Sequence, residues 1–342
     1  MRTRLPAEWE EQDGVLLAWP HAESDWRLHL EVVEPVFIEI VRQVSRFEMV
    51  LITAPDPETV RIILTCAGTS MERVRLFRID SNDTWARDFG PITVLENGQP
   101  VLLDFGFNGW GFKFAADMDN LISRRLAKEG AFSVPLRTIE LILEGGSIES
   151  DGAGTILTTS ACLLSPNRNP HLSRREIEMK LTGVLGADRF LWLESGHLAG
   201  DDTDSHVDTL ARLCPDDTIL HVSCTDPTDE HYPAIKAMVE ELQGFRTRDD
   251  RPYRLIPLPW PQARHDEDGQ RLPATYANFL VINGAVLVPT YGEINDDDAL
   301  RTIGDAFPRR KVIGVDCRPL ITQHGSLHCV TMQLPKGTID PK

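Results

Sequence analysis

Short apolar runs and amphipathic stretches alternate along the chain in an order that repeats. Apolar runs at residues 91–95 and 101–105 flank the sequence ENGQP, whose Asn-Gly pair is a strong hairpin signal. A helical pattern follows at residues 118–128, and another apolar run follows at 138–143. The segment therefore predicts a strand–strand–helix–strand unit.

The same order of elements recurs three more times toward the C-terminus. The helix expected from residue 173 begins with SRRE, which fits a capping box. Hairpin starts lie roughly 60 residues apart, a period typical of repeat arrays. The expected strands and helices of these units are 147–149, 155–159, 173–185 and 190–193; 207–213, 218–223, 234–242 and 253–257; and 276–282, 285–288, 297–307 and 311–315.

The two ends of the chain supply a fifth unit. The N-terminal region offers a strand at 15–19, a helix at 34–45 and a strand at 49–53, but no first hairpin strand. The apolar run at 327–333 fills that place. We therefore predict an α/β fold of five ββαβ units in a single domain over residues 1–342. A closed, propeller-like ring would leave no free sheet edge.

Unusual polar residues occupy corresponding places in these units. Asp88 and Glu144 each come just before a hairpin, His206 and Asp208 open another, and Cys329 falls within the expected closing strand. If the units surround an axis, these five side chains converge at one end of it. The sequence therefore predicts a shared central site.

The segment 200–208 reads GDDTDSHVD and is the densest group of acids near this site. Side chains at i and i+2 of an extended segment point the same way. His206 and Asp208 are therefore expected to share one face, with Asp204 and Asp202 continuing it. Burial of so many acids indicates a positively charged partner.

A cysteine, a histidine and several carboxylates in one pocket indicate nucleophilic catalysis on a cationic substrate. Carboxylates disfavour a nearby thiolate, so they would hinder the cysteine unless the substrate brings a positive charge. A guanidinium is planar, stays protonated and offers five N–H donors, which two carboxylates can grip while leaving its central carbon open. Trp85 stands three residues before Asp88 and could contact such a cation.

Composition fits a soluble globular protein, with 42% hydrophobic and 25% charged residues. The net charge of −17 argues against nucleic acid or an anionic membrane as partner, and it suits a cationic substrate or simply high solubility. No apolar run is long enough to span a bilayer, the N-terminus lacks a signal-peptide pattern, and the six cysteines form no CxxC pair. These features predict a cytoplasmic protein.

Two other classes of protein stay open from the residues alone. One is a metal-dependent amidine hydrolase, although the sequence lacks HExxH and any CxxC pair. The other is a non-catalytic binding protein for cationic amines. The ligands for a metal would come from Asp202, Asp204, His206 and Asp208, with His328 or Cys329.

Six segments make the chain resemble the agmatine deiminases of the guanidine-modifying (pentein) superfamily. Together they extend along nearly the whole chain. They are LPAEWEEQDGVLLAWPH at 5–21, NDTWARDFGP at 82–91, EGGSIESDGAGTILTTSACLLSPNRNP at 144–170, DDTDSHVD at 201–208, YANFLVINGAVLVPTYG at 276–292 and HGSLHCVTMQLP at 324–335.

The resemblance implies a five-bladed α/β propeller. It also implies hydrolysis of agmatine to N-carbamoylputrescine and ammonia, in putrescine and polyamine biosynthesis, with neither cofactor nor metal. Relatives commonly associate, so a homo-oligomer is expected. By motif position, Cys329 corresponds to the nucleophile and His206 to the general acid/base. The remaining implied site residues are the guanidinium-binding Asp88 and Asp208, Glu144 near the histidine, and the substrate-pocket residues Trp85 and Asp202.

Two departures from the family pattern lie close to this site. Residues 202–206 read DTDSH where the family usually has ETDGH, so Asp202 is shorter than a glutamate and Ser205 replaces a glycine. Residues 323–329 read QHGSLHC where the family has GGGNIHC. A changed backbone is expected at Ser205. The exact substrate therefore stays open between agmatine and another guanidine such as peptidyl-arginine.

Several residues near these motifs also have purely structural interpretations. Asp88 could pair with Arg87 rather than with substrate, and Glu144 could form a similar ion pair. His324 and His328 are expected to be structural. The cysteines that fall in apolar patterns, and are expected in the core, are Cys66, Cys162, Cys214, Cys224 and Cys317.

Overall fold

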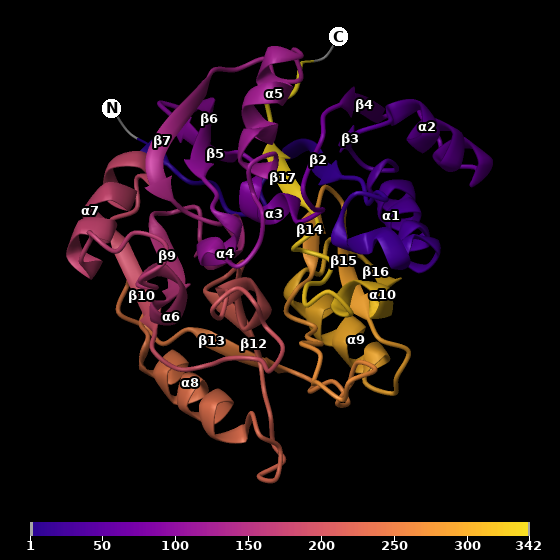
Figure 1. Ribbon diagram of the computed structural model, residues 1–342. Coiled ribbons are helices and arrows are strands. Elements are labelled where there is room, and N and C mark those ends of the chain that lie inside the picture. The colour runs from indigo at the N-terminus through magenta and orange to yellow at the C-terminus, as the bar shows by residue number, and fades with distance from the viewer. Residues whose placement is uncertain (1–2, 341–342) are drawn as a thin grey trace.

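The computed structural model describes residues 3–340, which form five small mixed β-sheets with helices between them (Figure 1). Each sheet starts from an antiparallel strand pair and adds a parallel strand on one side. A parallel neighbour needs a crossover connection, and a helix supplies it in every sheet. The predicted order of strand, strand, helix and strand is therefore confirmed.

The first two complete units along the chain contain the following elements. One holds α3 (Ala86–Phe89), β5 (Ile92–Glu96), β6 (Gln99–Gly106), α4 (Gly109–Phe112), η2 (Asp119–Leu121), α5 (Ile122–Lys128) and β7 (Leu136–Ile142), with β1 (Thr3–Arg4) on the β5 edge. The next holds η3 (Gly145–Ser147), β8 (Ile148–Ser150), β9 (Thr155–Thr159), α6 (Ser160–Leu163), α7 (Arg174–Leu185) and β10 (Arg189–Leu193).

Two more units and the unit built from both chain ends complete the fold. They contain η4 (Val207–Thr209), β11 (Ala211–Cys214), β12 (Thr218–Val222), α8 (Tyr232–Gly244) and β13 (Arg254–Leu258), then β14 (Leu280–Ile282), β15 (Ala285–Thr290), α9 (Asp296–Ala306), β16 (Lys311–Asp316) and α10 (Arg318–Ile321). The last contains β17 (Met332–Pro335), β2 (Gln12–Ala18), η1 (Asp25–Leu28), α1 (Leu30–Val44), β3 (Met49–Ala54), α2 (Pro57–Cys66) and β4 (Val74–Arg78).

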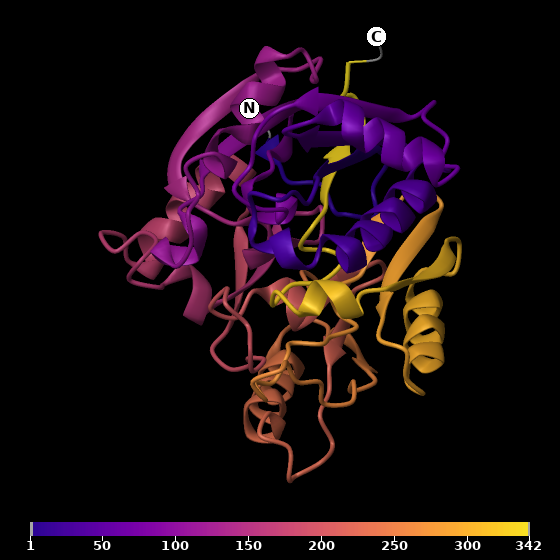
Figure 2. The same ribbon diagram turned by 45° about the vertical axis from the view of Figure 1, so that its right-hand side comes forward.

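The two ends of the chain share one sheet, as expected. Strand β17 pairs antiparallel with β2, with Met332 opposite Leu16. Figure 2 shows this yellow C-terminal strand among the indigo N-terminal elements. Helix α2 and strand β4 were not predicted, and β4 is the strand that makes this sheet four-stranded. The C-terminal segment therefore supplies the antiparallel strand that the N-terminal segment lacks.

The interiors of all five sheets belong to one hydrophobic core. Leucines on the central strands β2, β6, β9, β12 and β15 are fully buried in the same cluster: Leu16, Leu103, Leu157, Leu220 and Leu287. Helices α2, α7, α8 and α9 lie toward the periphery of the view in Figure 1. Among residues 3–340, no helix combines the length and the apolar character that a bilayer-spanning segment needs.

Three strands are shorter than predicted, and each shortfall lies beside the central polar residues. The run 327–333 is strand only from Met332, so Cys329 lies in the turn before β17 rather than within a strand. The run 207–213 starts as the 3-10 helix η4, and the run 276–282 is strand only from Leu280. In each case the polar side chains leave the ladder pattern and bond to one another instead.

Candidate active site

Cys329 lies beside an aspartate and an asparagine from two other units. Its Sγ is 3.9 Å from Asp208 Oδ2 and 3.4 Å from Asn278 Oδ1. The Asn278 side chain ties the three residues together, because its Oδ1 accepts from the Cys329 backbone N–H and its Nδ2 donates to Asp208. Burial raises the pKa of the Cys329 thiol well above its usual value, and the charges of Asp208 and Asp88 raise it further.

Three predicted site residues converge on Gly146, in the 3-10 helix η3. The Gly146 N–H donates to Asp88 Oδ1 at 3.0 Å. A Cβ placed on Gly146 would lie 2.6 Å from His206 Nδ1, 3.0 Å from Asp88 Oδ1 and 3.1 Å from Asp208 Oδ2. Only glycine leaves room for all three groups. The structure therefore brings Asp88, His206 and Asp208 together around one backbone position.

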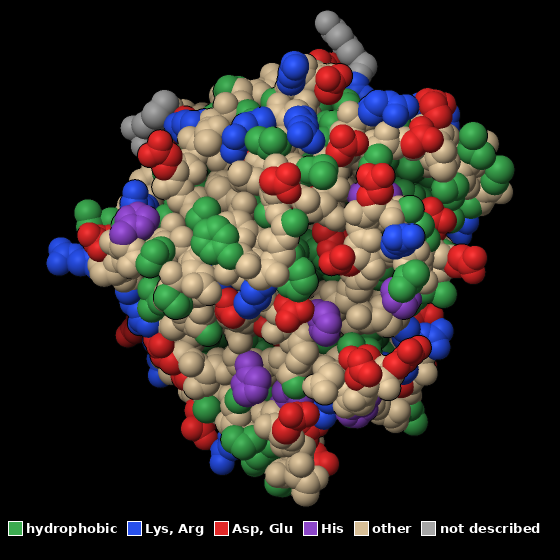
Figure 3. Space-filling view, viewed as in Figure 1, with side chains coloured by type: hydrophobic (Ala, Val, Ile, Leu, Met, Phe, Trp, Pro, Cys, Tyr) green, Lys and Arg blue, Asp and Glu red, His purple; other side chains and the backbone are tan. Residues whose placement is uncertain are grey.

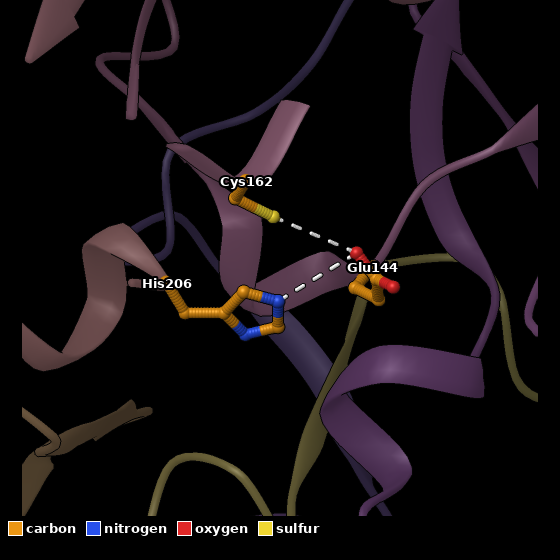
Figure 4. Close-up of side chains that lie close together, drawn as sticks. All are labelled: Glu144, Cys162 and His206. Atoms are coloured by element: carbon orange, nitrogen blue, oxygen red, sulfur yellow. Dashed lines mark hydrogen bonds and ion pairs between the residues drawn. The ribbon is translucent and has the colours of Figure 1, made fainter. Parts of the chain in front are cut away.

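His206 lies between two carboxylates and is fully buried. Its Nδ1 is 3.6 Å from Asp88 Oδ1, and its Nε2 is 3.6 Å from Glu144 Oε2 (Figure 4). Burial lowers the pKa of His206, but Asp88 and the neighbouring Cys162 and Glu144 outweigh it and hold that pKa well above its usual value. The imidazole is therefore protonated near neutral pH and can donate a proton.

Glu144 is held in place by Arg168, whose Nε donates to both carboxylate oxygens at 2.8 and 2.9 Å. Burial opposes ionisation, yet the nearby His206 ring and the charge of Arg168 keep the pKa of Glu144 below its usual value. The Cys162 thiol contacts the same carboxylate at 3.7 Å (Figure 4). The predicted structural ion pair of Glu144 is present, and it orients the carboxylate toward His206.

Asp88 binds a proton more readily than an ordinary aspartate, but it stays mostly ionised at neutral pH. Burial, with the charges of Asp208 and Glu144, raises its pKa to about 6, although His206 opposes the shift. Its Oδ2 accepts a 2.9 Å hydrogen bond from the indole of Trp110. Arg87 pairs with Glu8 at 3.1 Å instead, so the alternative Asp88–Arg87 ion pair is wrong.

A cavity of about 240 Å³ opens onto Cys329 and Asp88. Its wall includes the aromatic rings of Trp85, Trp110 and Phe114. Four of its lining residues are aspartates, and no lysine or arginine of the described chain lines it. His206, Asp208 and Glu144 lie behind this wall. The aspartates that line the cavity are Asp25, Asp83, Asp88 and Asp202.

Gly325 is the one glycine retained from the family's glycine-rich run, and it faces Trp85. A Cβ there would lie 2.1 Å from the Trp85 ring, so any side chain would displace the tryptophan from the cavity wall. Ser205 and His324 stand where the family has glycine, and both keep a left-handed φ of 67°. A left-handed φ is one that glycine adopts readily, and the expected change of backbone at Ser205 stays a prediction.

Asp202 and Asp204 separate rather than share a face with His206. Asp204 binds Lys113 at 2.7 Å and Arg168 at 2.5 Å. Asp202 lines the cavity with its side chain 3.9 Å from His324 Nε2. The segment is a turn rather than an extended strand, so the i, i+2 argument fails for these two acids. Within residues 3–340, they form no metal-binding group with His206 and Asp208.

The sequence did not predict four residues of the site. Asn278 lies in the YANFL motif, but nothing in its apolar surroundings marks it as a ligand of the nucleophile. Trp110 follows a glycine and has a φ of 54°, so its position depends on an unusual loop. The others are Gly146 and Arg168, each inside a quoted family motif. His328 is buried as expected, and it bonds to Asp208 at 2.7 Å.

Five cysteines were expected in the core, and the structure confirms four. Cys66, at the end of α2, is exposed instead.

Acidic and basic side chains are interspersed over the face shown in Figure 3, so the negative charge does not gather there in a single patch.

Comparison with known proteins identifies the family of this chain. Residues 4–335 match the model of the Porphyromonas-type peptidyl-arginine deiminase family. The structure of a C. jejuni agmatine deiminase, a cysteine-to-serine variant with substrate bound, is 42% identical with a TM-score of 0.92, over 98% of this chain and 97% of that chain. A Porphyromonas gingivalis structure, provisionally named an arginine deiminase, is 50% identical with a TM-score of 0.93, over 99% and 100%.

A Shewanella sp. (strain MR-4) protein, provisionally named an agmatine deiminase, is 34% identical over 97% of this chain and 94% of its own length. An amidinotransferase from Microseira wollei shares the α/β fold at 13% identity, with a TM-score of 0.54 over 99% of this chain and 98% of that one. The match to the family model and these alignments cover nearly the whole chain. The chain belongs to the Porphyromonas-type peptidyl-arginine deiminase family, together with agmatine deiminases.

Proposed function

We propose that this protein is an agmatine deiminase, which hydrolyses agmatine to N-carbamoylputrescine and ammonia. The observation that carries the proposal is the cavity that holds the Cys329 thiol among acids, with no lysine or arginine of residues 3–340 in its lining. Such a lining suits a substrate that is cationic at both ends. The C. jejuni agmatine deiminase, at 42% identity, supports the same substrate.

Asp88 and Asp208 are the proposed clamp for the guanidinium. Asp208 uses its Oδ2 for His328 and Asn278, while its Oδ1 is buried without a hydrogen-bond partner among the residues that the structure describes. A buried carboxylate oxygen left unpaired is costly, and two N–H groups of a guanidinium would satisfy it. The cation would then lie beside Cys329, 3.9 Å from the same aspartate.

The distal ammonium of agmatine is proposed to lie near Asp202, with Trp85 along the chain between the two charges. Free arginine would bring a carboxylate into this acidic cavity, where no described lysine or arginine is available to pair with it. Peptidyl-arginine is the second candidate, because its carboxylate is neutralised in an amide and the family carries that name. These features favour agmatine over free arginine.

The first half-reaction breaks the bond between the guanidinium carbon and one nitrogen. Arrival of the cation lowers the pKa of Cys329, and the thiol proton leaves to solvent. The thiolate attacks the carbon and forms a C–S bond. His206, which is protonated at rest, donates its proton to the departing nitrogen, so ammonia leaves and an amidino-cysteine (thiouronium) remains. Glu144 and Asp88 stabilise the charged imidazole before that transfer.

The second half-reaction is the hydrolysis of that intermediate. Neutral His206 removes a proton from water, and the hydroxide adds to the same carbon. The C–S bond breaks, the electron pair returns to sulfur, and the hydroxyl proton is lost as the ureido product forms. General acid–base assistance of this kind contributes about 10²–10⁴-fold in rate. The side chains around Gly146 and Cys329 would supply the groups that this chemistry uses.

We further propose that the five sheets are the blades of a five-bladed propeller in one domain. Their shared core and the pairing of β17 with β2 support this arrangement. All six cysteines are free, which supports a reducing, cytoplasmic location. Association into a homo-oligomer remains part of the proposal.

Ammonia release tests the activity on agmatine, free arginine and an arginine-containing peptide. We expect turnover of agmatine that survives EDTA and is lost after iodoacetamide. Cys329→Ala should abolish turnover while agmatine still binds, as measured by calorimetry. Preference for the peptide would instead support the second candidate. Loss of activity with EDTA, or binding without turnover in the unmodified protein, would overturn the deiminase mechanism.

A further inference from the structure

A second group of donor atoms lies behind His206, away from Cys329. Glu144 Oε2 is 3.6 Å from His206 Nε2 and 3.7 Å from Cys162 Sγ, and all three donor atoms lie within 4.8 Å of one another (Figure 4). All three side chains are buried. The deiminase chemistry uses the histidine and the glutamate, but it gives no role to the Cys162 thiol.

The histidine of this group lacks a satisfied hydrogen bond. Both ring nitrogens of His206 are buried without a hydrogen-bond partner within the described part of the chain. Buried polar groups are rarely left unpaired, because desolvation without a partner costs free energy. The Nδ1 side is where we place the substrate. The Nε2 atom points instead to Glu144, beside Cys162.

We propose that Glu144, Cys162 and His206 form a Zn²⁺ site, and that its occupation switches the enzyme off. Zinc takes thiolate, imidazole and carboxylate ligands in a tetrahedral arrangement, with bonds of about 2.0–2.3 Å. In that geometry, neighbouring ligand atoms lie about 3.3–3.7 Å apart. The two measured separations, 3.6 and 3.7 Å, already match such edges. The fourth position would take water.

The surrounding charges are compatible with a divalent cation. The thiolate of Cys162 and the carboxylate of Glu144 together offset the two charges of zinc. The positive charge of Arg168 would oppose zinc binding, but its guanidinium also binds the carboxylate of Asp204 at 2.5 Å. Arg168 Nε donates to both oxygens of Glu144, at 2.8 Å to Oε2 and 2.9 Å to Oε1, so zinc on Oε2 requires Arg168 to give up the first bond and keep the second.

Zinc binding at this place would block the proposed deiminase reaction through His206. Metal on Nε2 displaces the imidazolium proton, and metal on Sγ displaces the thiol proton, so two protons are released for each ion bound. The N–H left on Nδ1 then belongs to a metal-bound neutral imidazole, which is a far weaker acid than imidazolium, so His206 could no longer protonate the departing ammonia. Because all three donors are buried, entry requires a local opening of the short helix α6 or of η4, and inhibition develops slowly.

Cobalt spectroscopy tests the metal site independently of activity. We expect Co²⁺ added to the Cys329→Ser protein to bind one equivalent with thiolate-to-cobalt charge-transfer absorption, and Zn²⁺ to displace it. Cys162→Ser should abolish that absorption and weaken Zn²⁺ binding by at least about 100-fold, more than loss of an outer-shell partner. Cys317→Ser, which removes another fully buried thiol, should change neither measurement.

His206→Asn provides a second variant that removes a different ligand, and it should lower Zn²⁺ affinity in the same way. Circular dichroism establishes that each variant is folded. Absorption that survives Cys162→Ser but disappears in Cys329→Ser would place the metal on the nucleophile and overturn the proposal. Absence of charge-transfer absorption in a folded, unmodified protein would overturn it as well.

The inhibitory role rests on the proposed function, whereas the metal site does not. Zn²⁺ should progressively slow ammonia release from agmatine, and EDTA should restore the rate. The Cys162→Ser variant should stay active and should not be inhibited by Zn²⁺. Cobalt binding without any deiminase activity would leave the site intact and refute the function. Deiminase activity with no cobalt binding would refute the site alone.

Discussion

Two buried groups of charges meet at Asp208, and they differ in where their positive charge comes from. The rear cluster consists of Glu8, Arg87, Glu149, Arg212 and His328. Here Arg212 binds both glutamates and also stacks on Phe279, 4.4 Å from the ring centre. Each acid of this cluster therefore contacts an arginine of the chain, although burial still raises the pKa of Glu149 to about 8.

The front cluster consists of Asp88, His206 and Asp208, and its one cation, the His206 imidazolium, is shared between Asp88 and Glu144 at 3.6 Å each. Asp208 Oδ1 and both nitrogens of His206 have no hydrogen-bond partner within residues 3–340. His328 connects the two clusters, because its ring contacts Asp208 at 2.7 Å on one side and Glu8 at 2.7 Å on the other. The comparison indicates that unsatisfied buried groups, rather than buried charge itself, identify the place for a substrate.

Asp88→Asn gives the largest expected effect, because it removes a carboxylate that the substrate is proposed to pair with. We expect kcat/KM for agmatine to fall about 10³-fold, in the range found when one partner of a buried charge pair is lost. The free energy of unfolding should stay the same or rise, since burial raises the pKa of Asp88 to about 6 and its charge is poorly compensated. Steady-state kinetics and urea unfolding measure the two effects.

If Asp88→Asn lowered the free energy of unfolding by as much as the free-energy equivalent of its loss in kcat/KM, the distinction between the two clusters would be contradicted. Such a result would show that the front acids stabilise the fold in the same way as the rear ones.

Arg212→Met should have the opposite profile, because it removes the cation that both rear glutamates share. Loss of one partner from a buried ion pair typically costs about 3 kcal/mol or more of unfolding free energy. Urea unfolding measures this loss. Arg174→Met removes a solvent-exposed ion pair with Glu194 and serves as the matched control, with an expected cost below about 1 kcal/mol. Equal costs for the two variants would show that the rear cluster does not stabilise the fold.

The repeat of elements could be predicted because each unit carries strong local signals. The Asn-Gly pair at residue 97 ends β5, and the capping box at Ser173 begins α7, where both its hydrogen bonds are present. Hydrophobic periodicity then located most strands. Helix α2 and strand β4 were overlooked because the repeat led us to expect only one helix and one strand after β2.

The site was predictable only where residue chemistry is unusual for its surroundings. Cys329, His206, Asp88 and Asp208 stand out as reactive or charged residues at corresponding places in the units. Asn278 does not, since an amide in an apolar segment has many structural uses. The rear cluster could not be predicted either, because its contacts join residues 63 to 320 positions apart, and only the folded structure shows that Arg212 meets Glu8.

The smallest expected effect concerns the pH dependence of Cys329 in the empty site. Burial and the two front aspartates hold the pKa of this thiol well above its usual value, so its thiolate fraction should still be rising at pH 9. Iodoacetamide labelling of Cys329, followed by mass spectrometry, should therefore accelerate from pH 7 to 9 without a plateau, with exposed Cys66 as the reference thiol. Asp88→Asn lowers that pKa, and each unit of pKa gives about a tenfold gain in thiolate. We expect labelling at pH 8 to increase severalfold in Asp88→Asn. A plateau near neutral pH, or no change in this variant, would mean that the front cluster does not keep the thiol protonated before the substrate arrives.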